Sequence, residues 1–269
     1  MPLADFDEYL EAIRVNRVAD FQQSAAMATL LRPMAMWRSF VSAPVAPTTS
    51  VALDKTSDIA VGPIPDSSTG SLCALGARLN TSGIAGCMMT LVDVLNHSGG
   101  LSGIITTEQT TNLPTATLTR YTSGEGVMIG LVIYSQVGTT ATTVTVRYTN
   151  QAGTGNRVST ATGFGGTNFR EANRIIPIPL QAGDTGVQSV EGVTLAATTA
   201  TAGNFGVVMF KPLTCFSLES TTGAMPLDNV SSGGIICAYQ AFDDDACLSC
   251  IGIIPVAQAI NGAILLAEV

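Results

Sequence analysis

From about residue 71 onward, the chain is a succession of short apolar runs separated by Gly, Asn and Thr, the pattern of β-strands joined by turns. In the run 143–148, Thr-Val-Thr-Val-Arg-Tyr, polar and apolar residues alternate with a period of two, as in a strand with one face in water. No interleaved helical pattern interrupts the series. The expected strands are 88–95, 115–121, 127–135, 142–149, 174–180, 187–196, 205–210, 234–239 and 251–256. The pattern predicts a mainly β fold, an antiparallel β-sandwich of jelly-roll type, over residues 71–269.

The first forty residues differ in kind from the rest. The segment 5–8, Asp-Phe-Asp-Glu, has the form of a capping box at a helix N-terminus. Phe6, Leu10 and Ile13 then recur at helical spacing, and Val18 and Phe21 extend the apolar side less regularly. An alanine-rich stretch, 24–31, would continue this helix until a proline stops it. Residues 1–40 are therefore predicted to form an N-terminal helical arm.

A proline-rich connector follows the arm. Trp37 and Phe40 precede it as an aromatic cluster, and prolines then occur at 44, 47, 63 and 65. Because proline removes a backbone donor and restricts φ, this density predicts an extended strap over residues 41–70. The pattern leaves open whether arm and strap pack on their own domain or on a neighbouring subunit.

Charge and cysteine content narrow the class of protein. The formal net charge is −8, with 12 Lys and Arg against 20 Asp and Glu, which argues against a nucleic-acid partner held through its phosphates. The acidic start argues against an export signal, and the most apolar stretch, 251–267, is interrupted by Pro, Gln and Asn, which argues against a membrane span. Six scattered cysteines are expected to be reduced and buried.

Two motifs could carry catalysis. Asp184-Thr-Gly186 matches the aspartic-protease triplet, which would work only in a homodimer, but Gly183-Asp-Thr-Gly186 is also a good β-turn. The single histidine, His97, lies in Asn-His-Ser-Gly-Gly and is interpreted as a turn residue. Neither motif indicates an enzyme.

Two further motifs could hold a metal ion. Cys247 and Cys250 have the spacing of a zinc knuckle, but a strand would point them to opposite faces, and a second knuckle is missing from the sequence. The acidic triplet 243–245 lacks the spaced ligands of a calcium loop and is interpreted as a solvated turn. The sequence therefore predicts no metal and no cofactor.

Four stretches of the chain resemble structural proteins of tailed bacteriophages. They are Gly-Gly-Leu-Ser-Gly-Ile-Ile-Thr-Thr at 99–107, Asn-Leu-Pro-Thr-Ala-Thr-Leu-Thr-Arg-Tyr-Thr at 112–122, Phe-Arg-Glu-Ala-Asn-Arg at 169–174 and Gly-Asn-Phe-Gly-Val-Val-Met-Phe-Lys-Pro-Leu at 203–213. The resemblance implies a virion component, and β-sandwich decoration (cement) proteins fit the size and the expected fold. It brings no family site residues with it.

The resulting hypothesis is a non-enzymatic protein on the outer surface of a phage head, assembled in the host cytoplasm. Its expected partners are the major capsid protein and its own copies, as a homotrimer. The expected interface residues are Phe6, Leu10, Ile13, Trp37 and Phe40, because buried aromatic and apolar side chains often anchor interfaces. The alternatives are a tail, neck or fibre-base component with a host-recognition role and, from another class, a homodimeric aspartic protease.

Overall fold

The fold is built from antiparallel β-strands. A computed structural model describes residues 18–23, 33–36, 45–60, 64, 66–68, 70–81, 87–218, 225–228, 241–253 and 260–268. The strands are β1 (Val18–Gln23), β2 (Pro33–Met36), β3 (Val51–Ala52), β4 (Ser71–Thr81), β5 (Cys87–His97), β6 (Met128–Ser135), β7 (Ala141–Asn150), β8 (Arg157–Val158), β9 (Thr162–Gly165), β10 (Ile175–Ile178), β11 (Val187–Leu195), β12 (Asn204–Leu218), β13 (Met225–Asp228), β14 (Phe242–Asp243), β15 (Leu248–Ile253) and β16 (Ile260–Glu268). The described residues contain no helix, so the prediction of a mainly β, antiparallel fold is confirmed.

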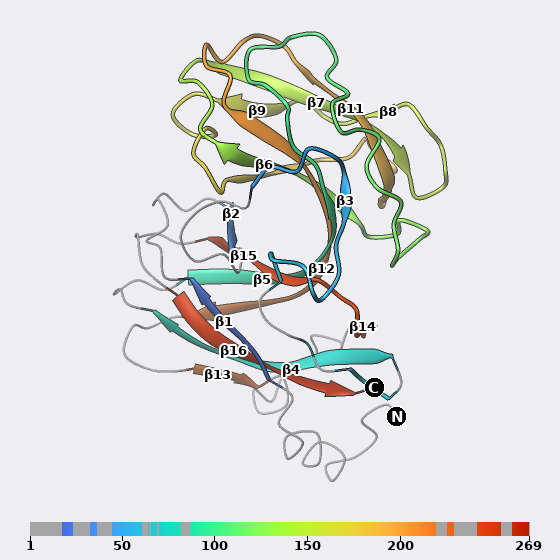
Figure 1. Ribbon diagram of the computed structural model, residues 1–269, viewed down its shortest axis with the longest axis vertical. Coiled ribbons are helices and arrows are strands. Elements are labelled where there is room, and N and C mark those ends of the chain that lie inside the picture. Colours follow the sequence, from blue (N-terminus) through green and yellow to red (C-terminus); the bar gives the residue numbers. More distant parts are fainter. Residues whose placement is uncertain are drawn as a thin grey trace.

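The strands form three sheets. Sheet A has the order β1-β16-β4-β13, with β14 beside β4. Sheet B has the order β10-β6-β12-β5-β15-β2, with β3 beside β5, and sheet C has the order β11-β7-β8, with β9 beside β7. Sheet C lies at one end of the molecule, sheet A lies at the other, and sheet B lies between them (Figure 1). The molecule therefore consists of two layered packings that share sheet B. The upper packing is formed by sheets B and C, and the lower packing by sheets A and B.

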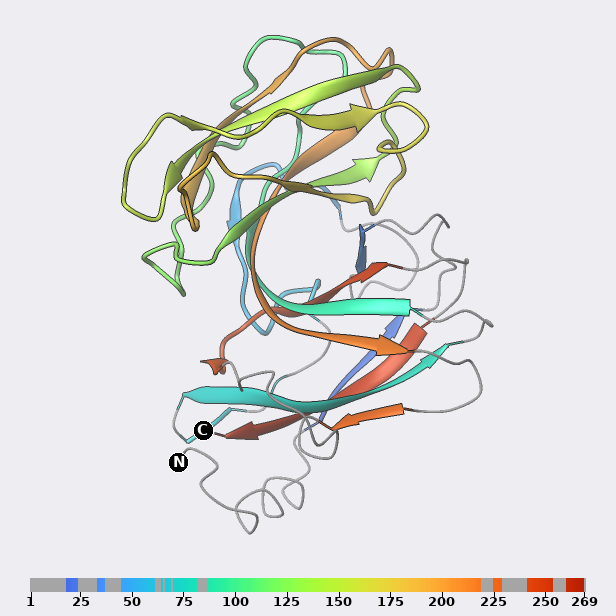
Figure 2. The ribbon, with the colours of Figure 1, turned by 180° about the vertical axis from the view of Figure 1, so that it is seen from behind.

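Strands β5 and β12 connect the two packings. The first half of β12 pairs with β6, and nearly the whole of β5 pairs with β12 from Val208 to Leu218. Two irregularities interrupt the β5–β12 register, between Met209 and Phe210 and between Pro212 and Thr214. Bulges of this kind bend a strand and increase its twist. Both strands curve from the upper packing into the lower one (Figure 2).

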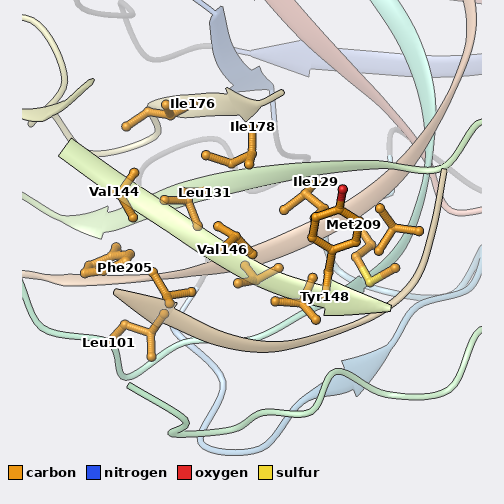
Figure 3. Close-up of a cluster of buried hydrophobic side chains, with 14 of the residues drawn as sticks. Leu101, Ile129, Leu131, Val144, Val146, Tyr148, Ile176, Ile178, Phe205 and Met209 are labelled. Carbon is orange, nitrogen blue, oxygen red and sulfur yellow. The ribbon is translucent and has the colours of Figure 1, made fainter. Parts of the chain in front are cut away.

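The main core lies between sheets B and C. Ile129, Leu131 and Ile133 of β6 are buried there against Val144 and Val146 of β7. Phe164 and Phe205 add an aromatic pair whose ring centroids are 4.6 Å apart. Figure 3 shows Ile129, Leu131, Val144, Val146 and Phe205 in the space between the two sheets. The alternating pattern of each strand places one set of side chains in this core.

The opposite face of sheet B carries a second core, which the strap covers. Val132 and Tyr134 of β6 point to this face, and Leu53, Ile59 and Ala60 of the strap are buried with them. Within the described part of the strap, the segment 53–60 therefore packs on its own chain.

Two expectations from the sequence need correction, and several others concern residues outside the described ranges. Residues Val18–Gln23 form strand β1, paired antiparallel with β16, so the predicted helix does not extend through them. The predicted strand 115–121 is irregular chain; it starts beside β11, where the Thr115 amide donates to the Val190 carbonyl (3.0 Å). The run 234–239, the start of the predicted helix and the expected interface residues Phe6, Leu10, Ile13, Trp37 and Phe40 lie outside the described residues.

A buried ion pair lies where β3 and β15 part from a shared edge of β5. The Arg120 guanidinium binds both Asp93 carboxylate oxygens, Nε to Oδ2 at 2.9 Å and Nη2 to Oδ1 at 2.7 Å. Arg120 also donates to the Leu53 carbonyl (3.0 Å), and Asp93 accepts from the Cys247 amide (2.9 Å). Burial raises the pKa of the Asp93 carboxyl, and Arg120 and the Cys247 amide oppose that shift. The pair supplies partners to backbone groups of both departing segments.

We expect Arg120→Ala to lower the free energy of unfolding by about 3–5 kcal/mol, because it leaves a buried carboxylate without its counter-ion. The matched control is Arg147→Ala, which breaks the partly exposed pair with Glu108 and should cost about 1 kcal/mol or less. Urea denaturation followed by circular dichroism measures both. Equal losses in the two variants would show that the buried pair has no special role.

Candidate interaction surface

One end of the upper packing collects several strand termini and their loops. Strands β6 and β11 end there, and β7 and β12 begin there, so the loops 136–140 and 196–203 lie side by side. The segment after β5 joins them, because the Gly103 amide donates to the Ala202 carbonyl (2.6 Å). The antiparallel topology thus brings three segments that are far apart in sequence to one end of the sandwich.

Thr199 holds these loops together from a fully buried position. Its amide donates to the Gly103 carbonyl (2.7 Å), and its carbonyl accepts from the Thr140 amide (3.2 Å). Its hydroxyl accepts from the Gly138 amide (3.0 Å) and donates to the Thr201 carbonyl (2.9 Å). These four hydrogen bonds join Thr199 to the backbone of all three segments, so a shift of Thr199 would break several of them at once. The loops are therefore tied into one rigid unit.

Glycine makes this close approach possible. A Cβ atom at position 138 would lie 1.6 Å from the Thr199 carbonyl oxygen, and one at position 103 would lie 2.5 Å from the Thr199 hydroxyl. Neither position has room for the side chain of a larger residue. Gly138 and Gly103 are therefore required by packing around Thr199.

The side chain of Gln109 holds the third segment in place. Its amide nitrogen donates to the carbonyls of Ser102 (3.0 Å) and Ile105 (3.2 Å), and its amide oxygen accepts from the Ser102 amide (2.7 Å). The Gln109 backbone pairs with Val193 of β11, which fixes the segment to sheet C. In the turn between Ser102 and Gln109, the side chains of Ile104 and Ile105 are 50% and 44% exposed. Two large apolar side chains are thus held in solvent by a rigid turn.

We define the loop-end surface as the exposed residues of 104–107, 139–141 and 196–202. Their sequences are Ile-Ile-Thr-Thr, Thr-Thr-Ala and Ala-Ala-Thr-Thr-Ala-Thr-Ala, of which only Thr199 is buried. None of the three segments contains a charged residue. The run 196–202 was the available sequence signal, but a run of Ala and Thr does not by itself distinguish an exposed loop from a strand.

The opposite end of the upper packing is charged, and Asp184 lies there. Its carboxylate accepts from the Tyr148 hydroxyl (2.6 Å), the Asn150 amide (2.7 Å) and the Arg157 guanidinium (2.9 Å). The hydrogen bond and charge of Arg157, with the other two donors, lower the pKa of Asp184 to about 2. The turn spans 181–184, two residues earlier than the sequence suggests, because the Asp184 amide donates to the Gln181 carbonyl. Asp184 anchors the β10–β11 connection to β7 and β8.

His97 is the last residue of β5, not a turn residue as predicted. The Tyr134 hydroxyl donates to the Ser98 carbonyl (2.9 Å), so His97 Nδ1 donates to the Tyr134 oxygen (3.0 Å). The imidazole is 7% exposed, and burial lowers its pKa from 6.5 to about 4. This histidine is therefore neutral at pH 7 and part of a buried hydrogen-bond chain.

Three of the described cysteines are buried, and the acidic triplet 243–245 is bonded to the strap. Cys247 and Cys250 are buried, as predicted, and so is Cys73, whereas Cys215 is exposed, contrary to the expectation. In the triplet, Asp244 accepts from the Ser67 amide (2.8 Å) and Asp245 pairs with Lys55 (3.3 Å). The triplet is thus more than a solvated turn, because it fastens the strap to the start of β15.

We expect Gly138→Ala to lower the free energy of unfolding by about 1–3 kcal/mol, because its Cβ atom would overlap the Thr199 carbonyl. Gly155→Ala is the control, since the nearest atom there lies 3.5 Å from the new Cβ, and it should change stability by about 0.5 kcal/mol or less. Chemical denaturation gives both values. A Gly138→Ala protein as stable as the control would contradict the assigned role of Thr199.

Stability should fall as the pH drops from 6.5 to 4, because the unfolded chain then binds a proton at His97 that the folded chain does not. The 2.5-unit difference in pKa corresponds to about 3 kcal/mol. His97→Asn keeps a side-chain donor for Tyr134 but does not titrate, so its stability should change less over this range. Thermal unfolding at a series of pH values tests this, and parallel curves for the two proteins would exclude His97 as the cause.

Comparisons of the chain with protein-family models, curated sequences and solved structures find no match. Within the described ranges, no group of three or more His, Cys, Asp or Glu side chains is placed to hold a metal ion. A search of the same residues finds no helix long and apolar enough to cross a membrane.

Proposed function

We propose that the chain is a non-enzymatic structural protein of a tailed-phage particle, a decoration protein that binds the outer face of the assembled head and stabilises it. The observation that carries this proposal is the loop-end surface, a rigid, uncharged surface with two exposed isoleucines. Exposed apolar groups on a fixed framework favour contact with another protein. The resemblance of four sequence stretches to tailed-phage structural proteins points to the particle.

The composition of the loop-end surface reduces the usual costs of association. Alanine and threonine lose little rotamer freedom when buried, so ordering them costs less than ordering lysine or glutamate. No charge in 104–107, 139–141 or 196–202 must lose its water. The bonds around Thr199 and Gln109 hold the loops before binding, so little backbone must be ordered afterwards.

The titratable groups of the described residues support a structural role. The Asp184 side chain is only 3% exposed and is bound by Arg157, so a carboxylate from a second copy has no access with which to share its proton. His97 hydrogen-bonds Tyr134 inside the second core. Asp93 is fully buried with Arg120. Each group fixes parts of the fold, and this favours the structural proposal over the aspartic protease.

In this proposal, the partners are the major capsid protein and further copies of the chain, as a homotrimer without nucleic acid, membrane or cofactor. The fold would be jelly-roll-like, with an N-terminal helix that begins at Asp5 and ends before β1. Because the protein would bind only the assembled lattice, each bound copy would stabilise that state by mass action.

The test is the copy number of the protein in purified particles of the phage that encodes it. Quantitative mass spectrometry against the major capsid protein should give a ratio of about one, as expected for a protein that covers the lattice. A ratio far below one would overturn head decoration and support the tail, neck or fibre-base alternative. Absence from the particle would overturn the virion role altogether.

A further inference from the structure

We infer that Arg170, at the border of the loop-end surface, binds a carboxylate of the major capsid protein, from an Asp or Glu side chain that lies among apolar side chains. The inference deepens the proposed function and rests on it, because it states the chemistry that the shell presents to this surface. Two features of the described residues support it, the unpaired guanidinium of Arg170 and the exposed apolar side chains of the adjoining turn.

The loop 165–170 joins the loop-end surface as a fourth segment. The Val137 amide donates to the Arg170 carbonyl (3.2 Å), which places Arg170 directly beside the loop 136–140. A Cβ atom at Gly165 would lie 2.8 Å from the Thr199 side chain, so the beginning of this loop packs against the residue that holds the other segments. Arg170 is therefore carried by backbone that belongs to the same rigid unit.

The Arg170 guanidinium has no carboxylate partner in the part of the chain that the structure describes. Its Nε atom is buried without a hydrogen-bond partner, and the residue as a whole is half-buried, within reach of a group that arrives from solvent. The adjacent Glu171 carboxylate binds a different guanidinium. Each other arginine whose side chain is described binds a carboxylate of the chain itself, namely Arg120, Arg147, Arg157 and Arg174. Arg170 thus lacks the counter-ion that the other arginines have.

The charges around Arg170 leave it as the charge that a partner meets at contact distance. None of the three segments of the loop-end surface contains a charged residue. Glu108 follows directly on 104–107, but its carboxylate is bound to Arg147, Oε1 to Nη2 at 2.6 Å. The formal net charge of −8 acts at long range and is largely screened beyond about 8 Å at physiological ionic strength. A carboxylate on the partner is the group that complements Arg170.

The exposed isoleucines favour a protein segment over a free anion as the occupant. Ile104 and Ile105 lie on the loop-end surface and keep about half of their area in water. A small anion would gain only the ion pair with Arg170, whereas a protein segment also removes the isoleucine side chains from water. The excluded water strengthens the ion pair in turn. A nucleic acid would need a row of cations for its phosphates, and this border offers one.

The experiment measures binding of the purified full chain to shells of the encoding phage that were assembled without it. Arg170→Gln removes the charge, and Arg170→Glu reverses it. The control, Ala152→Glu with Thr154→Glu, changes the net charge as much as Arg170→Glu does, at exposed positions of the opposite end. Circular dichroism and thermal unfolding confirm that each variant is folded.

Arg170→Gln should raise the dissociation constant about tenfold, because a charge-assisted hydrogen bond is lost. Arg170→Glu should raise it about a hundredfold, since like charges then face each other. Binding of the wild type should weaken as salt is added, and binding of Arg170→Gln should depend less on salt. The control should bind like the wild type.

The apolar contribution is measured separately with the double variant Ile104→Ser with Ile105→Ser. It should raise the dissociation constant about tenfold, because less apolar area leaves water on binding. Its salt dependence should equal that of the wild type, since Arg170 is still present. A loss of folding would change neither term selectively, so the two sets of variants separate a contact from general destabilisation.

Three outcomes would overturn the inference while the wild type still binds shells. They are Arg170→Glu binding as tightly as the wild type, equal salt dependence of the wild type and Arg170→Gln, and a control weakened as much as Arg170→Glu. Self-association of the wild type that Arg170→Gln abolishes, measured by sedimentation without shells, would assign the surface to a second copy and also overturn it. A wild type that does not bind shells overturns the proposed function and this inference together.

Discussion

The described structure depends on the buried ion pair between Asp93 and Arg120. Two segments, β3 of the strap and β15, use the same edge of β5 and then part, which would leave backbone groups without partners in the interior. Arg120 reaches this point from the irregular segment after β5 and binds Asp93 together with the Leu53 carbonyl. A carboxylate and a guanidinium buried together satisfy more groups than either could alone. Strap, sheet B and β15 are therefore joined at one place.

The shared sheet B also supports the loops of the loop-end surface. β12 runs from the loop-end surface through the main core and on toward sheet A, and its first residues pair with β6. Thr199 and Gln109 then fix the loops to strands that cannot shift separately. A surface on such a framework binds with little loss of conformational freedom, and this property links the fold to the proposed role in an assembly.

Sequence patterns predicted the strands that contribute to the main core and failed where pairing partners decide. The runs 127–135, 142–149 and 187–196 correspond to β6, β7 and β11, because alternating apolar residues suit a strand with one buried face. Segment 115–121 alternates too, but Leu118 and Arg120 are buried without belonging to a ladder. Val18–Gln23 was expected in a helix, yet it pairs with β16, since an open sheet edge outweighs weak local propensity.

By itself, the sequence determined the β class and the antiparallel pairing, because these depend on local alternation and on turn residues. It also determined the net negative charge and the uncharged run 196–202. Only the tertiary structure decided that this run meets residues 104–107 and 139–141 at one end of the sandwich, and that His97 and Asp184 are internal anchors. The physical reason is that each of these features needs hydrogen bonds between segments far apart in the chain, and local periodicity carries no information about such contacts.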